Sequence, residues 1–391
     1  MKKRIAFIFR DTLLGWNGGI NYYKNLVDIL QESQCYEPVI FASPKLQVLI
    51  QKKNPKAEVH YYDYLTDGTF STNLRKFVLY LFKYNLFINS ALKKNNIDFV
   101  SHNEEFPMNK NTKCKSLSWI PDFQSYHYPE LFSKKSMDRD LLVRKLLIGN
   151  SNGVIVSSYD AKKDLMKYFP KTDESKVRVF QFGLPPIPEN SFDDSVLDKY
   201  DVSPYSYFLI TNQFWAHKNH IVVLKALVEI SKKQLNIPFT ILVTGLQNDP
   251  RGSENFAMLK DFIEKNNLSL YFRMTGNIPY SDVKLLQHFS MAVIQPSLFE
   301  GWNTAVEECK LLGKKIILSN IPVHLEQNPE NVIFFDPHDE DKLADILLGV
   351  YGNYDRKKEE IIEKNSEHKQ MELWQKFSNK YIALIDEALA E

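Results

Sequence analysis

The chain has 391 residues, of which 44% are hydrophobic and 25% are charged, the balance of a folded globular protein rather than a disordered one. This length exceeds what a single ordinary core requires and predicts two α/β domains of similar size. The 49 basic and 48 acidic residues give a net charge of +1, so no overall field attracts the protein to nucleic acid, and a nucleic-acid partner is not expected.

Three widely spaced cysteines, Cys35, Cys114 and Cys309, form no CxxC pair and predict neither a disulfide framework nor a structural zinc site. A reducing, cytoplasmic location is the simplest interpretation. The basic start and the apolar run at residues 5–9 are similar to a signal peptide, but the run is too short because Arg10 follows it directly. We interpret the run as a first buried strand. No stretch approaches 18 apolar residues, so any membrane contact is expected to be peripheral, at the inner face of the cytoplasmic membrane.

Short apolar runs alternate with longer amphipathic segments along the chain, a pattern typical of parallel sheets covered by helices on both faces. The pattern occurs twice, which predicts two Rossmann-like, doubly wound domains facing each other across a cleft. The expected strands are residues 5–9, 38–42, 97–100, 116–120, 154–156 and 177–182 in the first half, and 207–211, 239–244, 271–274, 291–294, 315–318 and 332–335 in the second.

A proline-rich segment at residues 183–190 separates the halves, because its three prolines remove backbone donors and disfavour helix. We therefore expect an amino-terminal domain over 1–186 and a carboxyl-terminal domain over 187–370. The chain becomes largely helical after Asp339, and a final helix over about 371–391 is expected to cross back to the first domain. Its apolar residues at helical spacing are Leu373, Phe377, Tyr381, Ile382 and Ile385.

Residues 75–94 form an amphipathic stretch with aromatic side chains between basic ends. One interpretation is a helix that lies on an anionic membrane surface. The other is a well-buried helix whose lysines extend their stems to solvent. We expect the buried helix and keep the membrane surface as the alternative.

Two glycines, Gly18 and Gly19, follow the first expected strand and precede a helix expected over residues 21–30. Paired glycines let the backbone approach a phosphate, and the start of a helix offers free N–H groups. The spacing is not GxGxxG, and no acidic residue is well placed after the second expected strand, so a dinucleotide site is disfavoured. A tight strand-to-helix turn without a ligand explains the glycines equally well.

A late segment, QPSLFEGWNTAVEE, begins where a strand is expected to end and continues into a helix expected from Thr304. In open α/β sheets, ligands bind in the crevice beyond the carboxyl ends of the strands. Glu300 and Glu308 can accept paired hydroxyls of a sugar or a ribose, and free N–H groups around Asn303 and Thr304 can hold a pyrophosphate. Without a ligand, both glutamates are explained by the helix dipole, and Thr304 with Glu307 predicts a capping box.

This segment resembles the retaining glycosyltransferases of family 4, in the GT-B fold, whose mark is two glutamates separated by seven residues. The resemblance implies that Glu300 contacts the donor sugar and that Glu308 contacts the nucleotide ribose. The loop with Gly276 and Asn277 is implied to lie beside the base.

A second segment, TNQFWAHKNH, follows the first expected strand of the second half. In the wider family an arginine and a lysine six residues apart hold the donor pyrophosphate; Lys218 matches the lysine, and Asn212 stands where the arginine is usual. The segment resembles a bacterial surface-polysaccharide, or O-antigen type, subgroup reading NQFW-x-HKNH. With one fixed positive charge fewer, neutralisation of the pyrophosphate would depend more on Lys218 and helix dipoles. The alternative for Lys218 is a solvated lysine at the start of a helix. His217 and His220 have no third ligand or carboxylate nearby in the sequence, so they are weak evidence for a metal site. We expect roles in helix capping and packing for them.

In the first half, SWIPDFQSYHYPELF resembles the WIPDFQ segment of the same subgroup. Asp122 and His127 are best placed to reach an acceptor hydroxyl or the donor sugar. The subgroup often has histidine directly after the glutamine, where this chain has Ser125. A loop held by Asp122 bonded to its own backbone is the alternative.

The resemblance thus implies a retaining glycosyltransferase that moves a hexose or deoxyhexose from a GDP- or UDP-linked sugar to a saccharide or lipid-linked saccharide acceptor in surface-polysaccharide synthesis. No cofactor and no metal are expected, because no Asp-x-Asp segment is placed to hold magnesium. Alternatives are a nucleotide-sugar 2-epimerase of the same fold, a non-catalytic nucleotide-sugar-binding partner and, more remotely, a Rossmann oxidoreductase. The expected catalytic residues are Asp122, His127, Lys218 and Glu300, and the expected donor-binding residues are Gly18, Gly19, Asn212, Gln213, Lys218, Gly276, Asn277, Glu300, Gly301, Trp302, Asn303, Thr304 and Glu308.

Overall fold

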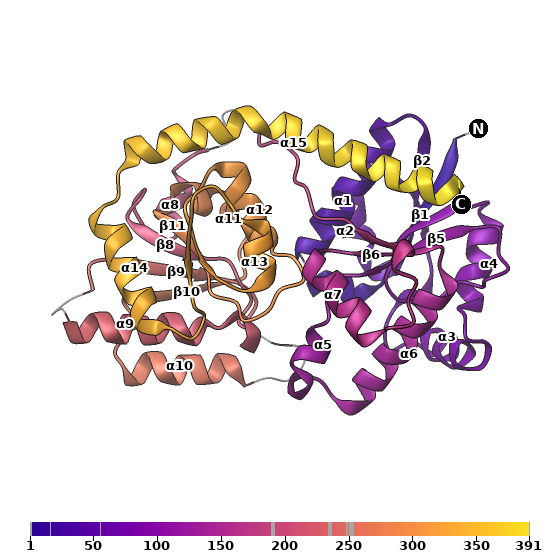
Figure 1. Cartoon of the computed structure of the whole chain (residues 1–391), viewed down its shortest axis with the longest axis horizontal. Helices are drawn as coiled ribbons and strands as arrows, with labels where there is room; N and C mark the ends of the chain where they lie inside the picture. Colours follow the sequence, from indigo (N-terminus) through magenta and orange to yellow (C-terminus); the bar gives the residue numbers. More distant parts are fainter. Residues whose placement is uncertain are drawn as a thin grey trace. The chain divides into compact units, whose positions relative to one another are not determined.

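The structure, a computed structural model, describes residues 2–15, 17–54, 56–188, 192–233, 237–247, 249 and 254–390. The chain divides into two units, each with its own parallel sheet (Figure 1). Unit 1 comprises Met1–Gly183 and Trp374–Glu391, and unit 2 comprises Leu184–Leu373. The division falls inside the proline-rich segment, of which residues 189 and 190 lie outside the described residues.

Seven parallel strands form the sheet of unit 1, in the order β3-β2-β1-β4-β5-β6-β7. The central strand β1 has fully buried Ile5, Ala6 and Phe7, and burial on both faces explains why its sequence is a continuous apolar run. The strands are β1 (Lys3–Phe9), β2 (Tyr36–Ala42), β3 (Glu58–Tyr61), β4 (Phe99–Asn103), β5 (Lys115–Ile120), β6 (Gly153–Val156) and β7 (Val177–Val179).

Several helices of unit 1 begin at a capping side chain that accepts a free N–H group of the first turn. Thr69 caps α3, Ser133 caps α6 and Ser158 caps α7. The helices of this unit are α1 (Asn17–Glu32), α2 (Gln47–Lys53), α3 (Phe70–Phe82), α4 (Leu86–Lys94), α5 (Gln124–His127), α6 (Lys134–Asn150) and α7 (Tyr159–Tyr168).

Six parallel strands form the sheet of unit 2, in the order β10-β9-β8-β11-β12-β13. Alternate residues of β8 face opposite sides: Phe208 and Ile210 join one core with α9, α10 and α14, and Tyr207 and Leu209 join another with α8 and α11. The elements are β8 (Tyr207–Ile210), β9 (Thr240–Thr244), β10 (Phe272–Gly276), β11 (Ala292–Gln295), β12 (Ile316–Ser319), β13 (Val332–Phe335), α8 (Val196–Lys199), α9 (His220–Lys233), α10 (Asn255–Lys265), α11 (Tyr280–Phe289), α12 (Thr304–Leu312), α13 (Pro322–Gln327) and α14 (Glu340–Gly352).

Both sheets have the same connectivity around their first strand. In unit 1, β1 lies between β2 and β4; in unit 2, β8 lies between β9 and β11. The direction of winding reverses at that strand, and the crevice at its carboxyl end is where sheets of this type bind ligands. The predicted pair of doubly wound α/β domains is confirmed.

The last helix, α15 (Arg356–Ala390), contributes to both units: its residues up to Leu373 belong to unit 2 and those from Trp374 to unit 1. In unit 1, the ring of Phe377 stacks on Phe180 at 5.1 Å, and the hydroxyl of Tyr381 lies 2.8 Å from the Ser101 hydroxyl. These contacts place the carboxyl-terminal part of α15 in unit 1, although the helix begins at Arg356 rather than near residue 371 as predicted.

Three details differ from the sequence expectations. Strand β3 was not expected, because Glu58–Tyr61 is a partly exposed edge strand without an apolar run. Helix α1 begins at Asn17, four residues earlier than expected. Residues 75–94 are two helices rather than one, since the C-cap residue Lys83 is left-handed, with φ of 60°.

Candidate functional site

Lys218 and Glu300 form an ion pair at the carboxyl edge of the unit 2 sheet. Lys218 lies in the short 3₁₀ turn between β8 and α9, and Glu300 lies in the loop between β11 and α12. Their side chains are nearly buried, and Lys218 Nζ is 2.7 Å from Glu300 Oε1. Because β8 and β11 are neighbours at the switch point, the sheet brings together two residues that are 82 positions apart.

Side-chain amides and hydroxyls hold the Glu300 loop in place. The Ser297 hydroxyl donates to Glu300 Oε1 at 2.7 Å, and Asn303 Nδ2 lies 3.1 Å from Gln295 Oε1 and 3.4 Å from Glu300 Oε1. Asn303 Nδ2 also lies 3.2 Å from Nε2 of His324, whose pKa burial lowers to about 4, so this imidazole is neutral. The Glu300 carboxylate is therefore fixed by three groups.

Asn303 is also the N-cap of α12, because its Oδ1 accepts from the Ala305 N–H at 3.0 Å. Thr304 is the first helical residue, and Glu307 instead accepts from Gln327 and pairs with Lys310. The predicted Thr304–Glu307 capping box is wrong, because the helix begins at Thr304, one residue earlier than that motif requires.

Glu308, the other predicted glutamate, lies in α12 and contacts α11. Tyr280 donates to its Oε1 at 2.6 Å and Gln287 donates to its Oε2 at 2.7 Å. Burial raises the pKa of this carboxyl group. The structure thus does not pair Glu308 with Lys218 or with Glu300.

Two buried donor atoms of the same edge have no hydrogen-bond partner among the described residues: Asn212 Nδ2, after β8, and Trp302 Nε1, beside Glu300. Asn212 is only 3% exposed. A buried donor without an acceptor costs about 1–3 kcal/mol, so such atoms call for an explanation. Both residues were in the predicted donor-binding set.

The remaining predicted residues of unit 2 lie at the ends of neighbouring strands or in the loops after them. The N–H of Gly245, after β9, donates to the Gly276 carbonyl at 2.9 Å. A side chain at Gly245 would collide with the Asn212 carbonyl at 2.2 Å and with the Cα of Gln213, so this glycine lets two loops pack together. Asn277 is exposed and lines a hollow of about 440 Å³ with Thr275. Gly301 separates Glu300 from Trp302 and is partly buried.

The two histidines of this segment are packed inside unit 2. His220 begins α9, and its ring stacks on Phe214 at 4.8 Å; burial lowers its pKa to about 3. The ring of His217 lies 5.8 Å from the ring of Trp215. Among the described residues, no cluster of three or more His, Cys, Asp or Glu could hold a metal ion.

In unit 1, Gly18 and Gly19 lie inside the first turn of α1 rather than in the turn before it. Neither has a positive φ, and Trp16, which precedes the helix, lies outside the described residues. Their proposed contact with a phosphate stays a prediction.

Asp122 and His127 follow β5 in unit 1 and have protein partners. Asp122 Oδ1 accepts from the Gln124 N–H at 2.9 Å, the loop contact considered as the alternative to a functional role. His127 Nε2 lies 2.6 Å from Asp164 Oδ2. The nearby Ser125 hydroxyl is 3.3 Å from Asp140. The catalytic roles of Asp122 and His127 stay predictions.

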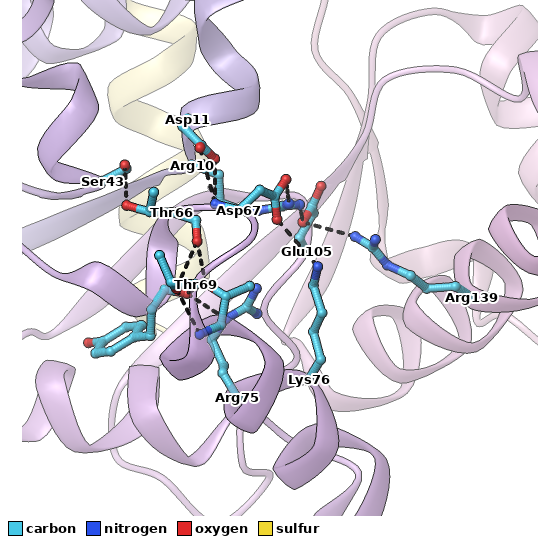
Figure 2. Close-up of polar contacts among 12 residues, drawn as sticks. Arg10, Asp11, Ser43, Thr66, Asp67, Thr69, Arg75, Lys76, Glu105 and Arg139 are labelled. Carbon is cyan, nitrogen blue, oxygen red and sulfur yellow. Dashed lines mark hydrogen bonds and ion pairs between the residues drawn. The ribbon is translucent and has the colours of Figure 1, made fainter. Parts of the chain in front are cut away.

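A second ionic group lies at the switch point of unit 1. Arg10, after β1, is 6% exposed and binds both Glu105, after β4, and Asp67, after β3. Figure 2 shows Arg10 between the two carboxylates, with Lys76 and Arg139 on their outer sides. Each of these carboxylates therefore has two cationic partners.

Glu104, next to this group, has a different environment. The Tyr23 hydroxyl donates to Glu104, and burial raises the pKa of this carboxyl to about 8, so it is mostly protonated at neutral pH. Two residues earlier, His102 has φ of 50° and lies 2.8 Å from the Tyr22 hydroxyl; burial lowers its pKa to about 3. Strained backbone and neutral titratable groups mark this edge as specialised.

These residues of unit 1 were not among the predicted site residues. The run Ser101-His102-Asn103-Glu104-Glu105 directly follows the strand expected over residues 97–100. Polar and charged side chains at the carboxyl end of a strand beside the switch point are a signal that could have identified them. For His324 in unit 2 no such signal exists, because its contact with Asn303 depends on the packing of α13.

Comparison with known proteins identifies unit 2. Residues 200–369, most of unit 2, match the family described as glycosyl transferases group 1. Over 282 residues, which are 72% of each protein, the chain is 23% identical to the O-antigen chain mannosyltransferase RfbU of Salmonella typhimurium. The latter similarity agrees with the predicted surface-polysaccharide subgroup.

Solved structures show the fold. A glycosyltransferase from Rickettsia africae has a TM-score of 0.71 and 18% identity, with 99% of both chains covered. Anabaena Alr3699/HepE in complex with UDP and glucose has a TM-score of 0.69 and 15% identity, again with 99% of both chains covered. The predicted GT-B type of fold and the resemblance to glycosyltransferases are confirmed.

Proposed function

We propose that this protein is a retaining, metal-independent hexosyltransferase of surface-polysaccharide synthesis. It would move a sugar from a nucleotide diphosphate to a saccharide or lipid-linked saccharide acceptor, in the cytoplasm. The observation that carries the proposal is the Lys218–Glu300 pair at the switch point of a glycosyl transferases group 1 domain. Because the curated relative is named a mannosyltransferase, a mannosyl residue is the first candidate.

Unit 2 supplies the groups that a nucleotide diphosphate sugar requires. The Lys218 ammonium and the positive end of the α12 dipole suit a pyrophosphate. Asn212 Nδ2 and Trp302 Nε1 are buried donors that a phosphate or sugar oxygen would satisfy. In this proposal Glu300 accepts hydroxyls of the sugar, and Glu308 accepts those of the ribose.

The proposed reaction keeps the configuration of the anomeric carbon. The bond from that carbon to the phosphate oxygen breaks, and the acceptor oxygen bonds to the same face of the sugar. The acceptor proton passes to the departing phosphate oxygen. Lys218 and the α12 N–H groups would stabilise the negative charge that grows on the leaving group. Three protein donors, Lys218, Ser297 and Asn303, already contact Glu300, so a role as covalent nucleophile is not assigned to it.

Metal independence makes a direct prediction. Because the lysine and helix amides would neutralise the diphosphate, EDTA should leave the initial rate of sugar transfer unchanged. The measurement is release of nucleoside diphosphate with and without chelator. A full loss that magnesium restores would contradict this part of the proposal.

The function itself is tested by a thermal-shift screen with GDP, UDP and their sugars, followed by transfer assays with the best donor. A ligand that binds the native state raises the melting temperature with the logarithm of its concentration over Kd. UDP-glucose belongs in the screen because the Anabaena structure contains UDP and glucose. Donor turnover without acceptor, giving an epimer, would favour a 2-epimerase. Tight diphosphate binding without transfer from any donor would favour a non-catalytic binding protein.

A further inference from the structure

Helix α3 in unit 1 has its polar side inward and its apolar side outward. Thr72, Arg75 and Leu79 are buried, and Arg75 is only 3% exposed. On the opposite side, Phe70 is 84% exposed and Phe77 is 60% exposed. A helix of a water-soluble domain normally has the reverse arrangement. Residues 75–94 were expected to form a buried helix, and for α3 that expectation is wrong.

Specific bonds fix the inward side of α3. The Thr72 hydroxyl donates to the Thr66 carbonyl at 2.7 Å, and Arg75 Nε donates to the Tyr64 carbonyl at 2.9 Å. The Arg75 guanidinium also lies 5.1 Å from the centre of the Phe106 ring. Figure 2 shows Arg75 and Thr69, the N-cap of α3, on this inner side. Rotating the helix to bury its aromatic residues would break these bonds, so the outward stripe is part of the fold.

The exposed stripe is a contiguous patch. Of 18 exposed large hydrophobic residues among the described ones, seven lie between residues 70 and 86. Isolated exposed apolar residues are ordinary, but a contiguous patch indicates an interaction surface. Four members, at helical positions i, i+4, i+7 and i+11, share one side of α3 and form the stripe, and the other three follow between Tyr80 and the start of α4. The members are Phe70, Leu74, Phe77, Tyr80, Leu81, Phe82 and Leu86.

The charged residues between Phe70 and Lys94 are all basic. Residues 68–97 contain five basic residues and no aspartate or glutamate, although the whole chain has 49 basic and 48 acidic residues. Lys83, Lys93 and Lys94 are exposed, and the Lys83 ammonium lies 4.2 Å from the centre of the Tyr80 ring. The buried Arg75 and the partly buried Lys76 complete the set. The surface therefore combines aromatic and aliphatic side chains with fixed positive charge.

We propose that this surface, the exposed residues of α3 and α4 from Phe70 to Lys94, docks unit 1 on a bilayer that contains anionic phospholipid. The Phe and Leu stripe would enter the boundary between head groups and acyl chains, and the lysines would contact lipid phosphates. α3 has 13 residues, and no helix of the described chain is long and apolar enough to cross a membrane. The contact is interfacial. A second copy paired through the same patch would bring like charges together, which disfavours a self-association surface.

Vesicle flotation with the full chain tests the proposal, in the absence of nucleotide and acceptor. Binding is expected to phosphatidylcholine vesicles with about 30% phosphatidylglycerol, to weaken with salt, and to be much weaker on phosphatidylcholine alone. Phe70→Ser with Phe77→Ser should weaken binding at least about tenfold, since each buried aromatic side chain contributes strongly. Lys83→Glu with Lys93→Glu should weaken binding to anionic vesicles to a similar extent. Loss of each lysine is expected to cost about fivefold in affinity, and the added negative charge weakens binding further.

The matched control is Leu270→Ser with Leu325→Ser, two exposed apolar residues of unit 2 that should leave binding unchanged. Thermal melts of each variant check folding, and the donor-induced melting shift reports separately on the proposed function. No binding to anionic vesicles, or equal binding by the Phe variant, would overturn the proposal. So would sedimentation showing a dimer that the Phe variant abolishes, without vesicle binding, because a second copy would then cover the patch.

Discussion

The two sheets have the same strand order around their first strand, yet different chemistry at the same place. In unit 2, Lys218 and Glu300 lie beside neutral amides, and Asn212 and Trp302 have donor atoms without a partner in the part of the chain that the structure describes. In unit 1, by contrast, the guanidinium of Arg10 is bound by two carboxylates. The shared topology determines where a ligand can approach, and the side chains determine what can be bound. We infer that the unit 2 edge is built for an anionic ligand, whereas the ionic group of unit 1 mainly stabilises its own edge.

Removing the lysine of unit 2 should have the largest effect. We expect Lys218→Ala to lower kcat/KM for sugar transfer by about 10²–10³-fold, because the growing charge on the leaving group loses its fixed cation. Steady-state kinetics measures this loss. Lys225→Ala, an exposed lysine on α9, is the control and should retain full activity. A loss below about tenfold would exclude Lys218 from stabilising the leaving group.

The two glutamates of unit 2 should separate nucleotide binding from sugar binding. Glu308→Ala should weaken binding of the nucleoside diphosphate itself, and Glu300→Ala should remove only the extra affinity that the sugar adds. Each loss is expected to be about tenfold to a hundredfold, the value of a charge-assisted hydrogen bond. Melting shifts with diphosphate and with diphosphate sugar, each relative to the unliganded variant, measure both. Equal responses from the two variants would contradict the separate roles.

The ionic group of unit 1 should affect stability instead. Arg10→Met leaves Asp67 and Glu105 without their central cation, although both keep contact with water. We expect the free energy of unfolding to fall by about 2 kcal/mol, less than for a fully buried pair. Arg139→Met, which removes an exposed partner 3.5 Å from Glu105, should cost less than about 0.5 kcal/mol. Unfolding in denaturant measures the free energy lost in each variant. Similar losses for Arg10→Met and Arg139→Met would show that burial of Arg10 does not strengthen its ion pairs.

Glu104 should give unit 1 a pH dependence. Its folded pKa of about 8 lies above the ordinary value of 4.5, so between these pH values the folded state keeps a proton that the unfolded chain has lost. Stability from this group is complete below pH 4.5 and is lost as pH rises toward 8, by at most about 1.4 kcal/mol per pH unit. Glu104→Gln should flatten the profile of unfolding free energy against pH. Glu130→Gln, at an exposed position of the same unit, should not; parallel profiles for both would refute the assignment.

Most of the fold was predictable because central parallel strands are buried on both faces and therefore read as apolar runs. The exceptions have physical causes. Strand β3 is a partly polar edge strand, and α3 has its apolar side exposed, so hydrophobicity alone predicted the wrong environment for it. At the site, the resemblance named Lys218 and Glu300 but not their contact, which depends on the adjacency of β8 and β11.

The shared helix α15 sets the order in which the molecule can be completed. Unit 1 needs Tyr381 and Ile385, which are fully buried there, but the ribosome makes them only after all of unit 2. The first 183 residues must therefore wait, with part of their aromatic core uncovered, until the carboxyl-terminal turns of α15 are synthesised. During that interval the uncovered aromatic surface is available to a chaperone. In a fragment that stops at Gly183 this surface would stay exposed.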